Sequence, residues 1–149
     1  MVKLAANLSM MFNEIDFRDR FSAASNAGFK GVEYLFPYEY QKEELVELLG
    51  RYGLIQVLHN LPAGNWDKGE RGIACLPDRV GEFQESVGLA AGYASALNCP
   101  QVNCLAGIKP DNVSSDKARE TLIANLKYGA SELSRSGVKL IIESINTID

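Results

Sequence analysis

Short apolar segments alternate along the chain with longer segments in which apolar residues recur every three or four positions. The short segments predict buried β-strands, and the longer ones predict helices that each bury one face. The expected strands are residues 4–8, 32–35, 55–58, 102–105 and 138–142. A helix is expected between each pair of strands, so the pattern predicts the order β-α-β-α-β-α-β-α-β.

The ends of the expected helices carry residues suited to helix boundaries. Apolar positions define the buried faces: Phe17, Phe21 and Ala24; Leu45, Leu48, Leu49 and Tyr52; Val80, Phe83, Val87, Ala91, Ala94 and Leu97; Leu122, Leu126, Ala130 and Leu133. Helix starts are expected where side chains can accept free backbone N–H groups, at Asp16, Asp78 and Ser114 or Ser115. Helix ends are expected where a left-handed backbone is tolerated, at Gly28, Gly53, Asn98 and Gly137.

Strands separated by helices run parallel, which leaves two α/β architectures. A flavodoxin-like doubly wound sheet uses five strands, whereas a (β/α)8 barrel uses eight strands and about 250 residues. The length of 149 residues favours the sheet. However, residues 143–149 follow the fifth strand without a helix to cover it, which is more typical of an interrupted repeat than of a finished sheet.

Composition narrows the class of protein and its partners. The chain is 46% hydrophobic and 23% charged with a net charge of -4, which is typical of one globular domain. Because Lys and Arg are scattered in an acidic chain, neither nucleic acid nor a membrane surface is an expected partner. No segment has the length of a signal peptide or membrane span, and Cys75, Cys99 and Cys104 lack metal or redox spacing. We therefore expect a cytoplasmic protein with reduced thiols.

Polar residues follow every expected strand. They are Asn7 and Ser9, Glu33, His59 and Asn60, Asn103 and Cys104, and Glu143 and Asn146. In parallel α/β folds, functional groups gather beyond the carboxyl ends of the strands. Each residue also has a simpler interpretation, as a hydrogen-bonding residue that finishes a strand.

Glu143 is the strongest of these candidates, because it directly follows the apolar segment 140–142. A carboxylate in such surroundings needs a cation or hydrogen-bond donors. A divalent metal would satisfy it, and a partly desolvated carboxylate could transfer a proton at neutral pH. His59, the single histidine, is equally well explained as a structural residue.

The segment 61–77 shows no helix or strand period and is long for a connection between a strand and a helix. Such loops often cover a binding site. Trp66 offers an apolar cover, and the planar guanidinium of Arg71 suits a substrate carboxylate. A solvated surface loop is the alternative. The motifs of dinucleotide, phosphate-loop and serine-hydrolase sites do not occur, so no nucleotide cofactor is expected.

Five segments of the sequence form a recognisable set. They are Ala-Asn-Leu-Ser-Met at 6–10, Gly-Val-Glu-Tyr-Leu-Phe-Pro-Tyr at 31–38, Leu-His-Asn-Leu-Pro-Ala-Gly-Asn-Trp at 58–66, Gly-Glu-Arg-Gly-Ile-Ala-Cys at 69–75 and Ile-Ile-Glu-Ser-Ile-Asn at 141–146. Together they resemble the hydroxypyruvate isomerase family, with its relative 2-oxo-tetronate isomerase, among the xylose isomerase-like TIM barrels. The resemblance covers residues 1–149 and implies a partial barrel that contains strands one to five.

The resemblance implies an intramolecular oxidoreductase that interconverts hydroxypyruvate and 2-hydroxy-3-oxopropanoate through an enediolate. Glu143 would be one of two acid/base glutamates and a ligand of a divalent ion, Mg²⁺ or Mn²⁺. His59 and Arg71 would bind the small hydroxy-oxo acid, with Glu70 orienting Arg71. Ser144 stands where the family pattern has proline.

The resemblance places the second glutamate on a later strand, so we expect the isolated chain to be inactive. Two partners remain as alternatives: further copies of this chain in a homo-oligomer, or a different, complementing chain. Alternatives for function are an isomerase or epimerase of 2-oxo-tetronate or another ketose, and a non-catalytic flavodoxin-like binding module. Strand order 2-1-3-4-5 would favour the module, and order 1-2-3-4-5 the barrel.

Overall fold

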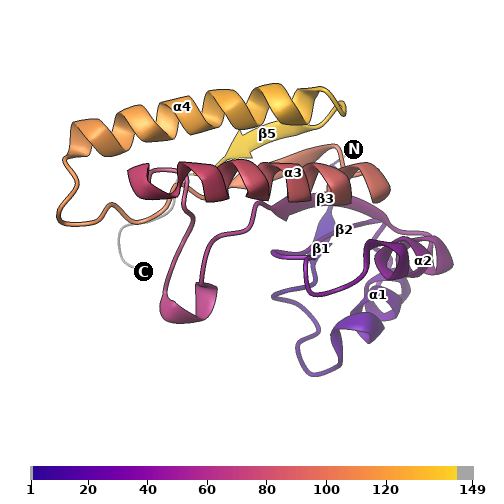
Figure 1. The fold of residues 1–149 in the computed structure, drawn as a ribbon. Coiled ribbons are helices and arrows are strands. Elements are labelled where there is room, and N and C mark those ends of the chain that lie inside the picture. Colours follow the sequence, from indigo (N-terminus) through magenta and orange to yellow (C-terminus); the bar gives the residue numbers. More distant parts are fainter. Residues whose placement is uncertain (1, 144–149) are drawn as a thin grey trace.

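The computed structural model describes residues 2–143 and forms one parallel sheet covered by helices (Figure 1). The strands are β1 (Ala5–Asn7), β2 (Gly31–Glu33), β3 (Ile55–Asn60), β4 (Gln101–Cys104) and β5 (Lys139–Ile142). The helices are α1 (Phe17–Asn26), α2 (Lys42–Tyr52), α3 (Val80–Ala96) and α4 (Ser115–Ser134). The order predicted from the apolar pattern is therefore confirmed, and Ser144 and Asn146 lie outside the described residues.

The strands follow one another in the sheet in the order β1-β2-β3-β4-β5, and every neighbouring pair is parallel. This order is that of a barrel. The flavodoxin-like alternative is wrong, because its first strand would lie between the second and third. Consecutive helices also pack against each other, so that the helices form one layer outside the sheet (Figure 1).

The core lies between the sheet and this helix layer. Ala6, Val32 and Val102 of the strands are fully buried there, together with Phe21 of α1 and Leu45 of α2. The faces predicted from apolar spacing on the first three helices are the faces that they bury, since Phe83, Val87 and Ala94 of α3 also belong to this core. On α4 the prediction is only partly right: Leu133 is buried, but Ala130 is exposed, and Thr121, Asn125 and Gly129 hold buried positions that apolar spacing does not mark.

Most helix boundaries agree with the sequence. The side chains of Asp16 and Ser114 accept hydrogen bonds from the backbone N–H groups of Arg18 and Lys117, as N-caps do. A positive φ at Gly28, Gly53, Asn98 and Gly137 marks the expected ends.

The predicted cap at Asp78 is wrong. Asp78 lies inside a single 3-10 turn, Pro77–Arg79, which leads directly into α3. Arg79 precedes the helix instead, and its guanidinium pairs with Glu82 in the first turn. A second 3-10 turn covers Trp66–Lys68. One turn is too short to produce a periodic apolar pattern, which is why the segment 61–77 looks irregular in the sequence.

One extra residue in β3 changes which side chains face which side of the sheet. Val32 pairs with Gln56, but the next residue, Glu33, pairs with Leu58, so that Val57 is extra. Side chains alternate between the two faces of a strand, and one inserted residue reverses this alternation. Leu58 and Asn60 therefore lie on the concave face away from the helices.

The concave face and both sheet edges are open within the part of the chain that the structure describes. Leu4, Ile55 and Ile142 are 71%, 64% and 65% exposed, respectively. In a closed barrel such residues would be covered by further strands. No described helix combines the length and the apolar character that crossing a membrane requires.

Candidate functional site

Polar side chains form a row along the carboxyl edge of the sheet. On its first half, Asn7 pairs in register with Glu33, and Asn7 Nδ2 donates a hydrogen bond to Glu33 Oε1 at 3.0 Å. Glu33 pairs with Leu58, and Asn60 lies two residues further along β3. Because residues two apart share a face, all of these side chains point to the concave side.

The second half of the row continues through β4 and β5. Asn60 pairs with Asn103, and Asn103 pairs with Ile141. Glu143 lies two residues after Ile141 and extends the same face beyond the end of β5. One residue in or directly after each strand therefore contributes to one polar surface: Asn7, Glu33, Asn60, Asn103 and Glu143.

This surface lines a cavity of about 510 Å³. The remaining lining residues are Met10, Tyr34, Leu35, Leu58, His59, Ile141 and Ile142. The carboxyl ends of the strands are the place where barrel enzymes carry their active sites. We therefore regard this cavity as the candidate active site.

A fixed amide pair lies at the centre of the cavity wall. Asn103 Nδ2 donates to Asn60 Oδ1 at 3.1 Å, and both residues are buried. The backbone carbonyl of Asn60 accepts a 2.6 Å hydrogen bond from the Tyr38 hydroxyl. Asn103 Oδ1 is buried and has no hydrogen-bond partner among the described residues. The pair thus presents one unsatisfied acceptor.

His59 borders the cavity, but its ring is 1% exposed. Its register partner is Val102, which pairs with Leu140, and Leu140 packs close to Gly129 of α4. This register directs the His59 side chain toward the helix layer. Nδ1 lies 3.2 Å from the Asn60 carbonyl oxygen and 3.3 Å from the Tyr38 hydroxyl. These contacts favour a supporting role for His59 over direct contact with a substrate.

The protonation of His59 follows from this burial. Removal from water disfavours the charged imidazolium and lowers the pKa of His59 to about 4. The ring is therefore neutral at neutral pH, and an Nδ1–H can donate to the Asn60 carbonyl. Nε2 has no partner within residues 2–143.

Glu143 is exposed in the described part of the chain. The sequence suggested partial desolvation, but the elements present leave the concave face uncovered at this point. Groups of three or more His, Cys, Asp or Glu side chains that could hold a metal ion are absent from residues 2–143. A complete divalent site, which needs several oxygen or nitrogen ligands, is therefore not formed by the described residues.

Arg71 and Glu70 lie on the loop after β3, outside the lining of this cavity. The Arg71 guanidinium stacks 3.9 Å from the centre of the Trp66 ring, and Nη1 donates to the carbonyls of Trp66 and Glu70. Glu70 contacts Arg71 through its backbone carbonyl, not through its carboxylate. The carboxylate pairs with Arg79 at 2.7 Å and accepts from the backbone N–H of Asn65, so it fixes the loop to the start of α3.

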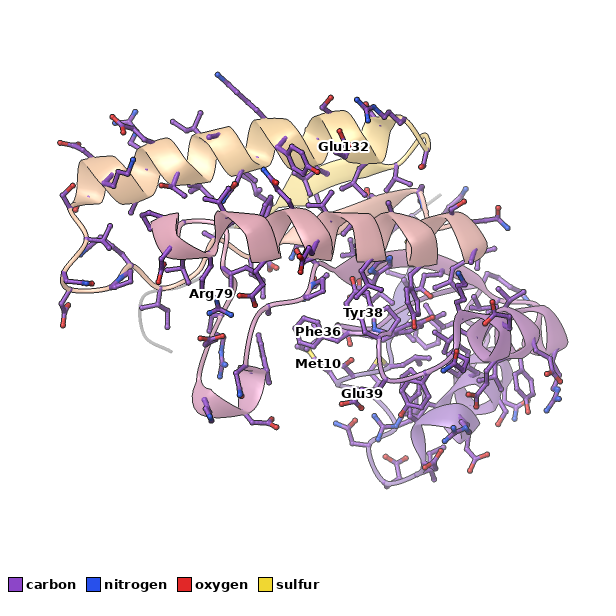
Figure 2. The ribbon with its side chains drawn as sticks, in the orientation of Figure 1. Met10, Phe36, Tyr38, Glu39, Arg79 and Glu132 are labelled. Atoms are coloured by element: carbon purple, nitrogen blue, oxygen red, sulfur yellow. The ribbon has the colours of Figure 1, made fainter. Side chains whose placement is uncertain are left out.

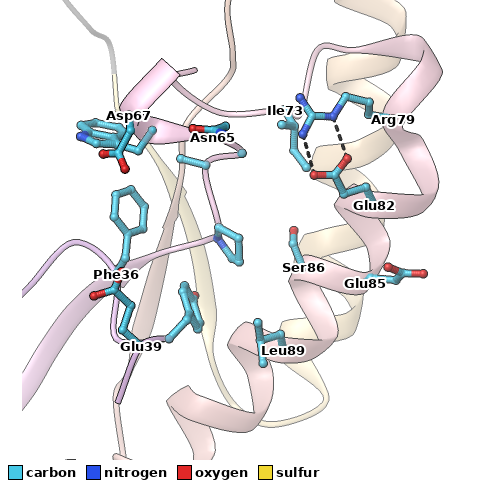
Figure 3. Close-up of a pocket in the computed structure, with 15 residues that line it drawn as sticks. Phe36, Glu39, Asn65, Asp67, Ile73, Arg79, Glu82, Glu85, Ser86 and Leu89 are labelled. Carbon is cyan, nitrogen blue, oxygen red and sulfur yellow. Dashed lines mark hydrogen bonds and ion pairs between the residues drawn. The ribbon is translucent and has the colours of Figure 1, made fainter. Parts of the chain in front are cut away.

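A larger cavity of about 910 Å³ lies between this loop and α3 (Figure 3). Asn65, Asp67 and Phe36 border one side, while Glu82 and Leu89 of α3 border the other (Figure 3). Phe36 and Tyr38 lie on the segment after β2, beneath α3 in Figure 2. This cavity contains none of the strand-end residues, so we do not assign the chemistry to it.

Sequence reasoning placed Asn60 and Asn103 at strand ends but gave neither a role. Their strand-end positions were the available signal. They are recognised as cavity residues because the extra residue in β3 reverses which of its side chains face the cavity. That reversal is visible only once the strand pairing is known.

The family model described as Xylose isomerase-like TIM barrel matches residues 21–148. Hydroxypyruvate isomerase of Escherichia coli K12 is 48% identical over 149 residues, and 2-oxo-tetronate isomerase of Haemophilus influenzae is 42% identical over 146 residues. The matches cover 58% and 57% of those proteins, so this chain spans somewhat more than half their length.

Solved structures agree. A Brucella melitensis protein described as a family 2 AP endonuclease superposes with a TM-score of 0.95 at 41% identity, covering 99% of this chain and 57% of that one. A D-allulose 3-epimerase from Methylomonas has a TM-score of 0.75 at 19% identity, covering 97% of this chain and 52% of that one, which supports the fold alone.

Proposed function

Because this chain belongs to the xylose isomerase-like TIM barrel family, we propose that it supplies the β1–β5 half of a hydroxypyruvate isomerase-type active site. The observation that carries the proposal is the continuous polar row along the carboxyl edge, which ends at Glu143. The 48% identity to the Escherichia coli hydroxypyruvate isomerase supports this substrate class, a small hydroxy-oxo acid.

The proposed reaction moves one proton between adjacent carbons and one between their oxygens. A base removes a proton from C3 of hydroxypyruvate. The electron pair of that C–H bond forms the C2–C3 double bond of an enediolate, while the π pair of the C2 carbonyl moves to O2. A proton is then delivered to C2, O3 gives up its proton as it becomes the aldehyde oxygen of 2-hydroxy-3-oxopropanoate, and O2 takes up a proton to become the new hydroxyl. Atoms and electrons balance without an oxidant. Glu143 is the proposed acid/base group on one face of the substrate.

The other proposed roles divide between the loop and the cavity. Arg71 is the candidate for binding the substrate carboxylate. Of its guanidinium nitrogens, Nη1 alone hydrogen-bonds to other described residues, so Nε and Nη2 are left to bind a ligand. The Trp66 ring holds the guanidinium plane, and Glu70 fixes the loop through Arg79. His59 supports Asn60 from the helix side.

The described residues supply one part of this proposed machinery. The second acid/base group and the ligands that would complete an Mg²⁺ or Mn²⁺ site must come from elements other than the described ones, and no step above depends on a metal. We infer that residues 1–149 alone are inactive and need a complementing chain or a further copy. A cytoplasmic location is part of this proposal, because all three cysteines are buried and free.

A chimera tests the proposal. Residues 1–149 are joined to the segment of Escherichia coli hydroxypyruvate isomerase that follows its matched region, and turnover of hydroxypyruvate is followed by NMR. We expect the chimera to turn over and the 149-residue chain to be inactive. Glu143→Gln should lower kcat of the chimera by about 10²- to 10⁴-fold, because it removes the proton-transfer group.

Glu120→Gln is the matched control, since Glu120 is an exposed carboxylate on α4 away from the cavity. It should leave kcat unchanged. A folded chimera without turnover would contradict the proposed function. Turnover by the 149-residue chain alone that is sensitive to Glu143→Gln would contradict its inactivity.

A 2-oxo-tetronate is the second candidate substrate, supported by relatives of that name that are 42% to 45% identical. It differs from hydroxypyruvate by one additional hydroxylated carbon. Comparing kcat/KM for both substrates in the same chimera decides between them.

A further inference from the structure

The unsatisfied oxygen of Asn103 points to a hydrogen bond that a substrate completes. We propose that Asn103 Oδ1 accepts a hydrogen bond from a hydroxyl group of the bound oxo acid, so that Asn103 distinguishes hydroxylated substrates from their deoxy analogues. The inference rests on the proposed function, since it concerns the same cavity, and it adds a binding residue and the chemical group that this residue recognises.

The structure places the Asn103 amide with its nitrogen toward Asn60 and its oxygen away from it. Its Nδ2 donates to Asn60 Oδ1, and its backbone lies in β4 between β3 and β5. The backbone carbonyl of Asn103 accepts from the N–H of Leu61, which ties it to the chain leaving β3. Because the nitrogen side of the amide is occupied, the oxygen side is the one that remains for a ligand.

Burial makes this oxygen informative. Asn103 is 3% exposed, and buried polar atoms in proteins nearly always have a partner. An acceptor left without one lowers stability, so such an atom in a cavity wall calls for an explanation. A water molecule can satisfy the oxygen in the free protein, and a ligand hydroxyl can replace that water.

Several polar groups around Asn103 are acceptors and suit a ligand that donates. The carboxylates of Glu33 and Glu143 accept hydrogen bonds when ionised. Asn7 uses Nδ2 on Glu33 and Oδ1 on the backbone N–H of Ser9, so its amide is occupied within the protein. A hydroxyl group matches this set of acceptors, whereas a methyl group leaves Asn103 Oδ1 unpaired.

The direct test uses the 149-residue chain and NMR detection of the Asn103 side-chain amide. Hydroxypyruvate and pyruvate, which differ by one hydroxyl group, are titrated separately. We expect hydroxypyruvate to shift the Asn103 Nδ2 resonances and pyruvate to leave them in place. Equal shifts with both ligands, or none with either, would overturn the inference.

Variants test the same point through affinity. Asn103→Ala should weaken hydroxypyruvate binding about tenfold and leave pyruvate binding unchanged, because only the hydroxyl contact is lost. Asn103→Ser retains an acceptor and should keep part of the preference. The control is Asn125→Ala, which removes another buried amide, bonded to the Ala74 carbonyl of the loop after β3. It should leave the ratio of hydroxypyruvate affinity to pyruvate affinity unaltered.

A purely structural role for Asn103 predicts a different result, in which Asn103→Ala weakens both ligands equally. The two proposals also fail separately. Hydroxypyruvate-specific shifts in the chain together with an inactive chimera would retain the inference and refute the isomerase. If the chimera turns over but Asn103→Ala leaves the ratio of hydroxypyruvate to pyruvate affinity unchanged, the isomerase is retained and the inference about Asn103 is refuted.

Discussion

At the scale of single residues, the site consists of two kinds of polar group. Asn60 and Asn103 face the cavity and are fixed by each other, while His59 lies on the opposite side of β3. His59 and Tyr38 both contact the carbonyl of Asn60, which makes them positioning residues for the amide pair. His59 and Asn60 are adjacent in the sequence, but His59 faces the helix layer and Asn60 faces the cavity.

The burial of His59 predicts a specific pH dependence of stability. Its pKa falls from 6.5 to about 4 on folding, so between these values the unfolded chain binds more protons than the folded one. The free energy of unfolding should therefore decrease as the pH falls from 6.5 to 4 and gain nothing from this group above 6.5. The full contribution is about 3 kcal/mol.

Urea unfolding at pH 7.5 and pH 5 measures this effect. Because His59 is the single histidine, His59→Gln should reduce the loss of stability between the two pH values, leaving what the carboxylates contribute. An unchanged pH dependence in His59→Gln would show that the ring can be protonated without disrupting its surroundings.

At the scale of elements, the strands and helices were predictable because apolar spacing records which faces are buried. The reversed alternation in β3 was not predictable, since Val57 looks like any other β-branched strand residue. The cap at Asp78 failed for a related reason, because Pro77 begins a separate turn that replaces the ordinary N-cap. In both places the residue types nearby are compatible with more than one backbone conformation.

The loop after β3 is held against the segment after β4 by two close glycines. Gly72 has a φ of +106°, and a Cβ placed there would lie 2.1 Å from the Leu105 carbonyl oxygen. Gly72 also bridges Ala106, and Gly107 N–H donates to the Arg71 carbonyl. This contact sets the position of Arg71 and Trp66.

Gly72→Ala should therefore destabilise the chain by about 3 kcal/mol or more, since strain and a backbone clash combine. Gly28→Ala is the matched control. Gly28 has a φ of +90° with no atom within 4 Å of an added Cβ, so strain alone applies. We expect about 1 kcal/mol there. Equal losses in urea unfolding would contradict the close contact.

At the scale of the whole molecule, the described part of the chain is an open barrel segment. Ile55 on its concave face and Leu4 directly before its edge strand β1 are mostly exposed. Exposed apolar patches bind other apolar surfaces, and unpaired sheet edges accept further strands. The fold thus agrees with the need for a complementing element in the proposed enzyme.

The exposed face should bind the dye ANS in the 149-residue chain. Ile55→Thr should reduce ANS fluorescence while changing the free energy of unfolding by less than about 0.5 kcal/mol, because the Ile55 side chain buries little surface. Val46→Thr is the control, since Val46 is exposed on α2 rather than on the concave face. Equal reductions in both variants would place the dye elsewhere.

The strand order also bears on how the polypeptide folds as the ribosome releases it. Within residues 2–143, each strand pairs only with its neighbours in the chain, and each helix packs against the helices before and after it. A βα unit can therefore dock as soon as it emerges, without waiting for a distant partner. Such growth keeps the chain segments that must find each other short, which favours rapid folding.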